Sequence, residues 1–302
     1  MRRSSLIMLV TIVLLGVLAV VVWNAVLHED RRGLLTVSFL DIGQGDAIFI
    51  DAPSGRQALI DGGPGASVLQ RLGEVLPWYD RSIDVLIGTH PDKDHIGGLI
   101  DVLERYQVDS LFQSSVQGET AIWNTFEKRI AEKQKEGMHI EEAERGKIID
   151  LGPSTGRGQG VHAYMEILFP DRSVPGLETN TGCVVARLVY GETSFMLPCD
   201  APRSIEEYLV YLASTSLGTS DGSLKSDVLK AGHHGSRTSS SPLFVGFVDP
   251  KYVVYSRGCD NTYGFPHPET VATFSAFNIP VEDTCKKGTV TFVSDGKTVA
   301  LK

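Results

Sequence analysis

The stretch THPDKDHIGG, residues 89–98, decides how this chain is interpreted. It follows an apolar run at residues 85–88, and it places four ionisable side chains close together: His90, Asp92, Asp94 and His95. The apolar run predicts a buried strand, and the apolar periodicity from residue 96 onward predicts a helix. The imidazole and carboxylate groups are therefore expected in a loop between a strand and a helix.

Two interpretations of this loop are open. Imidazole suits zinc, manganese or iron, and carboxylate suits the harder of these ions, so the loop could hold two nearby cations. The Gly97–Gly98 pair would then let the backbone turn tightly and start the helix beside the metals. The alternative is a helix N-cap with spare acids, because Asp caps helices well.

The N-terminal segment differs from the rest of the chain. Residues 6–27 carry no Asp, Glu, Lys or Arg, and about 20 apolar residues span a bilayer. A cleaved signal peptide has a shorter apolar region, roughly 7 to 15 residues, and a small-residue cleavage site, so we expect an uncleaved anchor. The remaining length and the 42% hydrophobic content suit a globular protein. We therefore predict an anchor and linker at residues 1–33 and one domain at residues 34–302.

The charges that flank the apolar segment bear on the cellular compartment. Two arginines precede the apolar segment and two follow it, so the positive charge that sets orientation is nearly balanced. Glu29, Asp30 and the free amino terminus favour an inside N-terminus and a single-pass membrane protein with an extracytoplasmic domain. The four cysteines lie too far apart for a C-x-x-C site. They are either buried thiols or, for Cys259 and Cys285 in an oxidising compartment, a disulfide.

The charge of the chain bears on possible partners. The net charge is −9, and the first 33 residues carry four arginines against Glu29 and Asp30, which leaves −11 for the rest. Such a surface repels nucleic acid unless a basic patch or bound cations reverse the field. No aromatic and basic stripe suggests a strand-binding groove. Local positive potential could come from residues that flank the motifs: Arg203, Lys225, Lys230, Arg237 and Arg257.

Strand-like and helix-like segments recur in the same order twice. The first half has strands at 34–42, 46–51, 57–63 and 84–90, with helices at 67–78, 96–106 and 119–137. The second half has strands at 162–170, 183–191, 193–200, 226–232 and 251–256, helices at 202–214 and 268–277, and a last strand pair at 288–294 and 297–302. The Gly-rich segment 152–160 lacks a phosphate-loop ending and is expected to be a surface loop, as is 215–223. The pattern predicts an α/β protein of two similar packed halves.

Three other predicted strands end in residues that can bind metals. Asp61 ends ALIDGG, Asp200 ends SFMLPCD, and His233 and His234 end VLKAGHHGS. Ligands of α/β proteins gather at strand ends, where loops cross. A lone strand-end Asp is usually a turn former, and a His pair is often polar surface. Together with the first loop, these strand ends favour a metal site.

The order of these motifs resembles the metallo-β-lactamase superfamily, whose signature is H-x-H-x-D-H. Longer segments are similar to the metallo-β-lactamase-like domain of the ComEC competence proteins, a DNA-uptake channel family: FLDIGQGDAIFI, LIDGGP, NTGCVVARLVYGETSFMLPCDA, DVLKAGHHGS and NTYGFPHPE. The resemblance covers about residues 34–302. It implies an αββα sandwich preceded by one transmembrane helix.

The resemblance also implies roles for individual residues and two divalent ions, zinc or manganese. His90 and Asp92 would hold one metal, Asp94 and His95 the second, and Asp200 would bridge them. His234 would complete the second site and His233 would face the substrate phosphate, although the two histidines could exchange roles. Asp61 would orient a ligand, as such sites usually require, and Asp46 would support the rim.

The chain departs from the family pattern at several positions. Asp92 replaces the second signature His, as expected in the ComEC branch. The next His ligand has no counterpart, because His139 and His162 lie in unrelated contexts and Asn180 stands in its place. Cys199 stands where Gly commonly precedes the bridging Asp. Phe265 replaces a His of the last motif, in which Asn261, Tyr263 and His267 remain as candidate substrate or supporting residues.

The implied activity is metal-assisted hydrolysis of a phosphodiester. Metal ions lower the pKa of bound water from 15.7 to roughly 7, so no separate strong base is needed. Asp94, His233 and His267 are the expected catalytic residues, the histidines acting on the leaving oxygen. The single apolar span cannot form a channel. The candidates are therefore a tethered nuclease linked to DNA uptake or processing, a phosphodiesterase for small or cell-envelope esters, and a non-catalytic module that binds nucleic acid or a partner. The missing His ligand motivates the last.

Overall fold

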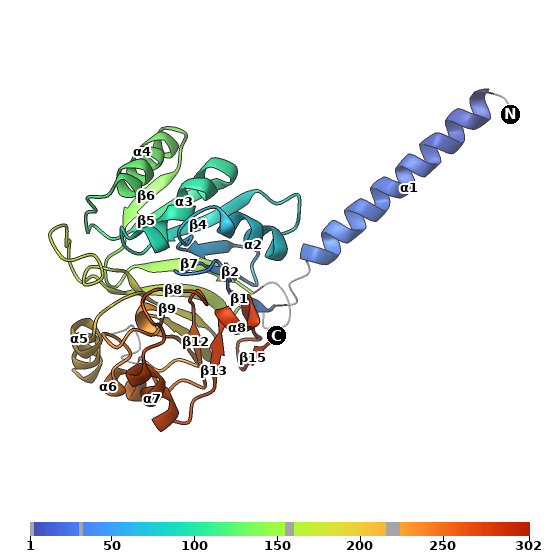
Figure 1. The fold of residues 1–302 in the computed structure, drawn as a ribbon. Helices are drawn as coiled ribbons and strands as arrows, with labels where there is room; N and C mark the ends of the chain where they lie inside the picture. Colours follow the sequence, from blue (N-terminus) through green and yellow to red (C-terminus); the bar gives the residue numbers. More distant parts are fainter. Residues whose placement is uncertain (1–2, 30–32, 155–159, 216–223) are drawn as a thin grey trace.

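A computed structural model describes residues 3–29, 33–154, 160–215 and 224–302. Most of the two predicted surface loops, 152–160 and 215–223, therefore lies outside the described residues. The long helix α1 (Arg3–Glu29) projects away from a body of two facing sheets (Figure 1). The predicted αββα arrangement is confirmed.

The first sheet has eight strands and three covering helices. Its order is β15-β14-β1-β2-β3-β4-β5-β6. The strands are β1 (Leu35–Phe39), β2 (Ile48–Asp51), β3 (Gln57–Ile60), β4 (Ser82–Gly88), β5 (Gln107–Gln113), β6 (His139–Glu142), β14 (Val290–Ser294) and β15 (Val299–Leu301). The helices are α2 (Ser67–Val75), α3 (Lys93–Arg105) and α4 (Ala121–Lys135).

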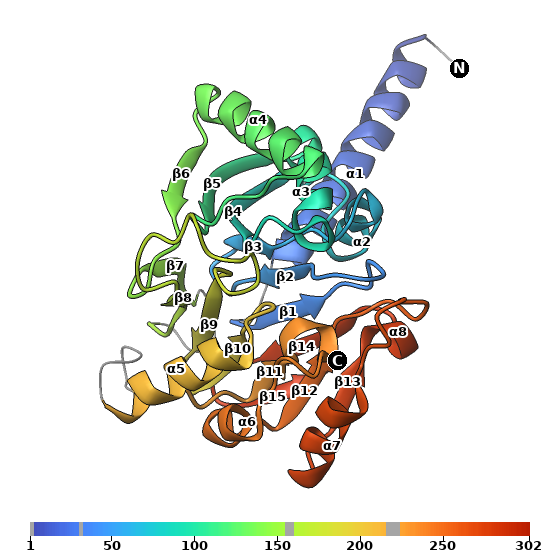
Figure 2. The same cartoon turned by 60° about the vertical axis from the view of Figure 1, so that its left-hand side comes forward.

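The second sheet has seven strands, in the order β13-β12-β11-β10-β9-β8-β7. They are β7 (Ile148–Pro153), β8 (His162–Phe169), β9 (Val185–Tyr190), β10 (Thr193–Leu197), β11 (Val228–Lys230), β12 (Tyr252–Tyr255) and β13 (Val281–Asp283). This half also contains α5 (Arg203–Ser214), the 3₁₀ turn η1 (Gly232–Gly235), α6 (Pro242–Val248), α7 (Pro268–Ala276) and α8 (Thr284–Lys287). Figure 2 shows α5, α6 and α7 on the side of the sandwich away from α3 and α4.

Three apolar clusters hold the layers together. The central cluster lies between the sheets and includes Phe39, Phe195 and Phe292, all fully buried. A second cluster joins the first sheet to α2, α3 and α4, and a third joins the second sheet to α5, α6 and α7. Because strand side chains alternate between faces, each sheet contributes to two clusters. This packing fixes the positions of the strand ends.

The strand ends that carry polar residues meet at one edge of the sandwich. Parallel pairing of β3 with β4 aligns Ile60 with Ile87, so Asp61 and the loop after β4 emerge together. In the second sheet, parallel pairing of β10 with β11 aligns Met196 with Leu229. The loops that follow β10 and β11 therefore also emerge side by side.

The glycines after the first motif have a different role from the predicted one. Helix α3 begins at Lys93, so Gly97 and Gly98 lie inside it and do not form a turn before it. A Cβ atom at Gly98 would lie 2.0 Å from the Gly62 carbonyl oxygen, and one at Gly97 would lie 2.5 Å from that of Pro64. The absence of side chains lets α3 pack directly on the loop after β3.

Candidate metal centre

The segments that follow β4, β10 and β11 bring imidazole and carboxylate groups into one buried cluster. His95 Nε2 lies 3.3 Å from Asp200 Oδ2, and His234 Nε2 lies 3.2 Å from the same oxygen. Asp94 Oδ2 is 3.5 Å from His234 Nε2. The rings of His90 and His95 are 4.0 Å apart between centroids. The structure therefore brings together the residues that the sequence assigned to metal binding.

Each buried imidazole is held through its Nδ1 atom and leaves its Nε2 atom without a hydrogen bond. The Nδ1 atom of His95 lies 2.7 Å from Asp61 Oδ2, that of His234 lies 2.9 Å from the Ser256 carbonyl oxygen, and that of His90 lies 3.1 Å from Thr89 Oγ1. The three Nε2 atoms are buried and find no hydrogen-bond partner among the described residues. Buried polar atoms are normally satisfied, and metal-binding imidazoles are typically oriented in this way. The donors therefore fit divalent cations.

The donors fall into a fuller and a sparser set. Asp46, His95, Asp200 and His234 offer ligand atoms that all lie within 4.8 Å of one another, and Asp94 adjoins them. The sparser set is His90 with Asp92, whose Nε2 and Oδ2 atoms are 3.6 Å apart. Asp92 occupies the N-cap position of α3, but its side chain makes no capping hydrogen bond. Helix capping therefore does not explain why this position carries a carboxylate.

Other polar groups lie close to His90 and Asp92, for which the sequence supplies no third histidine. Asn180 has a buried Oδ1 atom without a hydrogen-bond partner among the described residues, and its neighbour Thr179 interacts with Asp92. Cys199 places its Sγ atom 3.2 Å from His90 Nδ1 and 3.0 Å from Thr89 Oγ1. The thiol thus adjoins the nitrogen of His90 that faces away from Asp92.

Lys230 is a buried part of the cluster, whereas the sequence suggested a source of surface potential. Its Nζ atom lies 2.5 Å from Asp46 Oδ2 and 3.2 Å from Asp200 Oδ1, and it donates to the Cys199 carbonyl oxygen. Asp46 is also fully enclosed, so it lies beneath the cluster and not on its rim. Burial alone would raise the pKa of Asp46, but Lys230 and His234 hold it below its usual value. In the sequence, the sign of this burial is that Lys230 ends an apolar strand.

The cluster depends on unusual backbone geometry. Four of its non-glycine residues have φ in the left-handed region: Asp61 at 58°, Cys199 at 52°, His233 at 49° and His234 at 54°. This conformation is uncommon for residues with side chains, and such strain collects at functional sites. The turns aim the polar side chains at the ends of the strands back into the cluster.

Glu206 of α5 supports the histidine pair from behind. Its carboxylate accepts hydrogen bonds from the backbone nitrogens of Ser240 and Ser241, at 2.5 and 2.8 Å. Ser240 in turn accepts a hydrogen bond from Gly232, the residue before the pair. Burial raises the pKa of Glu206 to about 7, against these hydrogen bonds, which lower it. Nothing in the local sequence around Glu206 predicts this role.

The open side of the cluster is formed by the remaining candidates. His233 Nε2 lies 3.6 Å from Asp200 Oδ2, with 26% of its side chain exposed, and burial is the main cause of its lowered pKa. Phe265 contacts the rings of His233, His234 and His267. Tyr263 stacks on Phe265 and is 60% exposed. Asn261 holds this loop through its amide, which donates to the Gly258 and Phe265 carbonyl oxygens and accepts from the Phe265 backbone nitrogen.

Metal binding should strengthen as the pH rises. Burial alone would lower the pKa of His95 and His234. The carboxylates of Asp200 and Asp61 instead raise the pKa of His95 well above its usual value, and those of Asp200 and Asp46 do the same for His234. Without metal these imidazolium ions stabilise the fold below their unfolded pKa, and this contribution is lost as the pH rises through the folded pKa. A cation must displace their protons, so we expect Mn²⁺ affinity to rise about tenfold per pH unit for each proton released, at pH values below the raised folded pKa. Isothermal titration calorimetry checks this, and a flat affinity would contradict it.

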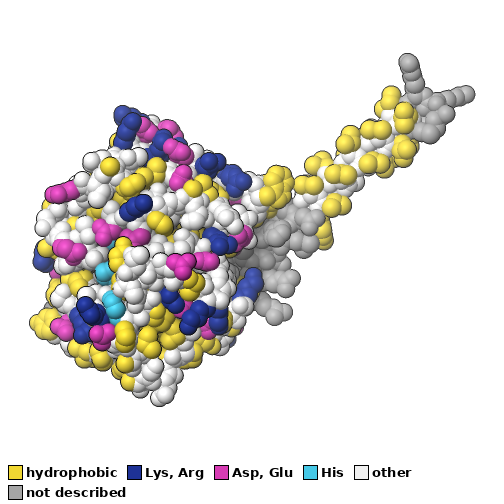
Figure 3. Space-filling view, viewed as in Figure 1, with side chains coloured by type: hydrophobic (Ala, Val, Ile, Leu, Met, Phe, Trp, Pro, Cys, Tyr) yellow, Lys and Arg dark blue, Asp and Glu magenta, His cyan; other side chains and the backbone are white. Residues whose placement is uncertain are grey.

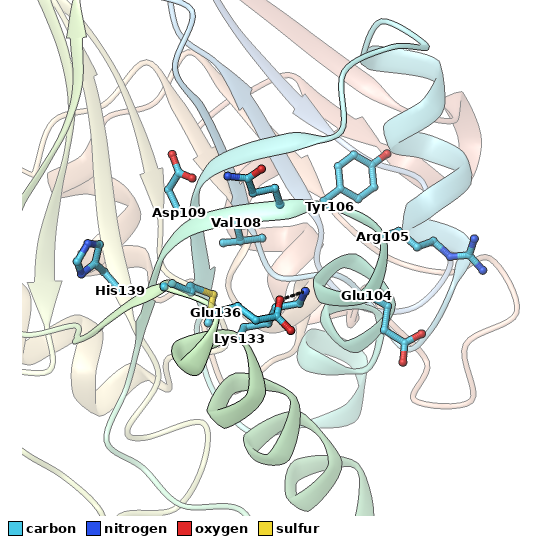
Figure 4. A pocket seen from close by; sticks show the side chains of 11 residues that line it. Glu104, Arg105, Tyr106, Val108, Asp109, Lys133, Glu136 and His139 are labelled. Atoms are coloured by element: carbon cyan, nitrogen blue, oxygen red, sulfur yellow. Dashed lines mark hydrogen bonds and ion pairs between the residues drawn. The ribbon is translucent and has the colours of Figure 1, made fainter.

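A groove without this donor cluster lies elsewhere on the molecule (Figure 4). It has a volume of about 800 Å³ and is formed where β5 and β6 begin and α3 and α4 end. Among its lining residues, Lys133 pairs with Glu136, and His139 is the only imidazole. This lining does not gather metal donors as the strand-end cluster does.

On the face drawn in Figure 3, histidine side chains surface beside acidic ones, on the side opposite α1.

The chain belongs to the metallo-β-lactamase superfamily, whose members are generally metal-dependent hydrolases. Residues 40–258, most of the chain, match the family model described as Metallo-beta-lactamase superfamily. The Igni18 metallo hydrolase from Ignicoccus hospitalis shares the fold, with a TM-score of 0.51 and 15% identity over 85% of this chain and 98% of that one.

Curated relatives narrow the resemblance to ComEC-like competence proteins, as the motifs indicated. The chain is 28% identical to ComE operon protein 3 of Bacillus subtilis, over 85% of this chain and 32% of that protein. It is 28% identical to Recombination protein 2 of Haemophilus influenzae, over 84% of this chain and 28% of that protein. It is 27% identical to Competence protein ComA of Neisseria gonorrhoeae, over 76% of this chain and 28% of that protein. The chain thus spans about a third or less of these relatives.

Proposed function

We propose that this protein is a membrane-anchored, metal-dependent phosphodiesterase that acts on DNA as a nuclease. One observation carries the proposal: three buried imidazole Nε2 atoms that find no hydrogen-bond partner among the described residues lie near carboxylates, that of His90 near Asp92 and those of His95 and His234 near Asp200. The cluster is reached from solvent through Asp92, Asp94 and His233, whose side chains are 41%, 30% and 26% exposed. The similarity to competence proteins supports DNA as the substrate.

The two donor sets would hold two divalent ions, zinc or manganese. Asp46, His95, Asp200 and His234, with Asp94 beside them, would form the fuller site, and His90 with Asp92 would form the sparser one. Bound ions would supply Lewis acidity and a water nucleophile available near neutral pH. Because Lys230 holds Asp200 Oδ1, the Oδ2 atom is the one turned toward His95 and His234. We expect the sparser site to bind its ion more weakly.

The protein's own groups position the substrate and handle protons. His233 is exposed beside Asp200, and its lowered pKa leaves a neutral imidazole at neutral pH. A neutral imidazole can donate a hydrogen bond to a phosphate oxygen, or to the leaving oxygen, where it would stabilise the negative charge that develops there. His267 would assist from the rim, where its Nδ1 atom accepts a hydrogen bond from the Arg237 backbone nitrogen. Asp61 would hold His95 in the orientation that points Nε2 at the ion.

The first 33 residues would anchor the hydrolase domain of residues 34–302. Within α1, the segment Leu6–Trp23 has a mean hydropathy of 3.0 with none of it buried, and it is long enough to cross a membrane. Cys259 and Cys285 form a disulfide, whereas Cys183 and Cys199 are buried free thiols. Disulfides persist mainly outside the cytosol, which supports an extracytoplasmic domain.

A second candidate is a phosphodiesterase for small or cell-envelope esters. Two of the five basic residues expected to attract a polyanion are committed internally: Lys230 to Asp46 and Asp200, and Arg257 to Asp283 at 2.6 Å. With a net charge of −11 outside the anchor, long DNA would be repelled unless the bound cations offset the field.

A substrate comparison tests the proposal on the full chain in detergent. With Mn²⁺ or Zn²⁺ we expect hydrolysis of bis(p-nitrophenyl) phosphate and of single-stranded DNA, and a chelator should stop both. Cleavage of phosphocholine esters without DNA cleavage would favour the second candidate. Bound metal without turnover of any of these substrates would overturn the enzyme and favour a binding module.

A further inference from the structure

The end of the domain that receives α1 can be located from strand register. Thr36 of β1 pairs with Asp51, Asp51 with Gln57, and Ala58 with Val85, so the starts of β1, β3 and β4 lie at one end of the first sheet. The Tyr190 hydroxyl donates to the Gly33 carbonyl oxygen at 2.6 Å, which fixes the chain where it enters β1. The metal cluster follows the opposite ends of β3 and β4. The anchor and the cluster are therefore at opposite ends of the sandwich.

An exposed aromatic pair lies at the anchor end. Trp78 and Tyr79, in the loop between α2 and β4, are 78% and 40% exposed, and their rings are 5.7 Å apart. The next residue, Asp80, fixes this tip, because its carboxylate accepts hydrogen bonds from Gln57 Nε2 and from the Ser82 backbone nitrogen. In Figure 1 the loop between α2 and β4 is on the side from which α1 projects.

Such a pair suits the boundary between lipid and water. Tryptophan and tyrosine combine an apolar body with a polar edge, and they are enriched at membrane interfaces. Two aromatic side chains bury roughly 300 to 500 Å², well below the roughly 800 Å² per partner of a stable protein interface. Their position beside the entry of an apolar helix makes a bilayer the surface they would meet.

We propose that Trp78 and Tyr79 insert into the interface of the bilayer that α1 spans, and so hold the domain with its metal cluster facing away from the membrane. This proposal rests on the proposed anchor. It adds a second point of contact, which would restrict rotation of the domain about the linker.

The three tryptophans of the chain allow a direct test. Trp23 lies in the apolar segment, Trp78 at the tip and Trp123 in the core at 5% exposure. The full chain is reconstituted into phosphatidylcholine vesicles with lipids brominated near the headgroup, as W23F, W78F and the W23F/W78F double variant. Trp123 stays in all three as a buried reference, and both substitutions are at exposed positions.

The expected result is that brominated lipid quenches roughly half of the Trp78 emission in W23F, because an interfacial indole contacts those lipids. The double variant should keep its emission, and W78F should be quenched through Trp23. Quenching in W78F but not in W23F would overturn the docking proposal and leave the anchor intact. Quenching in neither would overturn both. Emission from Trp78 that is protected from acrylamide but not quenched by brominated lipid would show a protein contact, which also overturns the proposal.

Discussion

Replacing Asp200 by Asn is expected to lower kcat/KM for phosphodiester hydrolysis by about a thousandfold or more. Asp200 Oδ2 is the oxygen that both His95 and His234 approach, at 3.3 and 3.2 Å. Asparagine keeps the size and an oxygen for Lys230 but removes the negative charge that binds a cation. We therefore also expect weaker metal binding, measured by metal analysis after dialysis. The variant should remain folded.

The matched control is Asp260→Asn, the same change at an exposed position outside the cluster. It should leave turnover and metal content within about twofold of the unmodified chain, since isolated surface substitutions have small effects. Comparable activity of the two variants would exclude Asp200 from the reaction.

Lys230→Met is expected to destabilise the metal-free protein by about 3 to 5 kcal/mol. Lys230 is 1% exposed, and its removal leaves the buried carboxylates of Asp46 and Asp200 without their shared cation. For a domain of this size the melting temperature should fall by about 10 °C, measured by calorimetry. The further substitution Asp46→Asn should restore part of the lost stability, because the double variant buries one negative charge fewer than Lys230→Met alone.

Lys251→Met provides the comparison for an exposed ion pair. Lys251 Nζ lies 2.8 Å from Asp227 Oδ1, but its side chain is 65% exposed, so its loss should cost about 1 kcal/mol or less. Equal melting temperatures for the two Lys→Met variants would show that burial does not amplify the Lys230 interaction.

The sequence predicted those parts of the site that are encoded locally. Residues 89–98 are contiguous, and Asp61 and Asp200 each end an apolar run, so strand ends could be recognised and assigned to one edge. The repeated order of strands and helices predicted two similar packed halves, and the motif resemblance implied the αββα sandwich. The motif resemblance then separated metal binding from helix capping, which local rules left open.

Features that depend on tertiary packing could not be predicted in this way. The burial of Lys230 requires Asp46 and Asp200, which precede it by 184 and 30 residues, to meet its Nζ atom. Strand β5 was missed because polar residues interrupt its QVDSLFQ sequence, and its burial comes from pairing with β4. Gly97 and Gly98 were assigned to a turn because their contact with residues 62–65 is invisible in the local pattern.

The buried ammonium group of Lys230 has a consequence for how the protein matures. Asp46, Asp61 and Asp200 would repel one another in an enclosed space if no positive charge accompanied them. Lys230 supplies one such charge from the chain itself, and protonated imidazoles supply others. We therefore expect the polypeptide to fold in a metal-poor environment and to bind ions afterwards, unlike small zinc domains that remain unfolded until they are loaded.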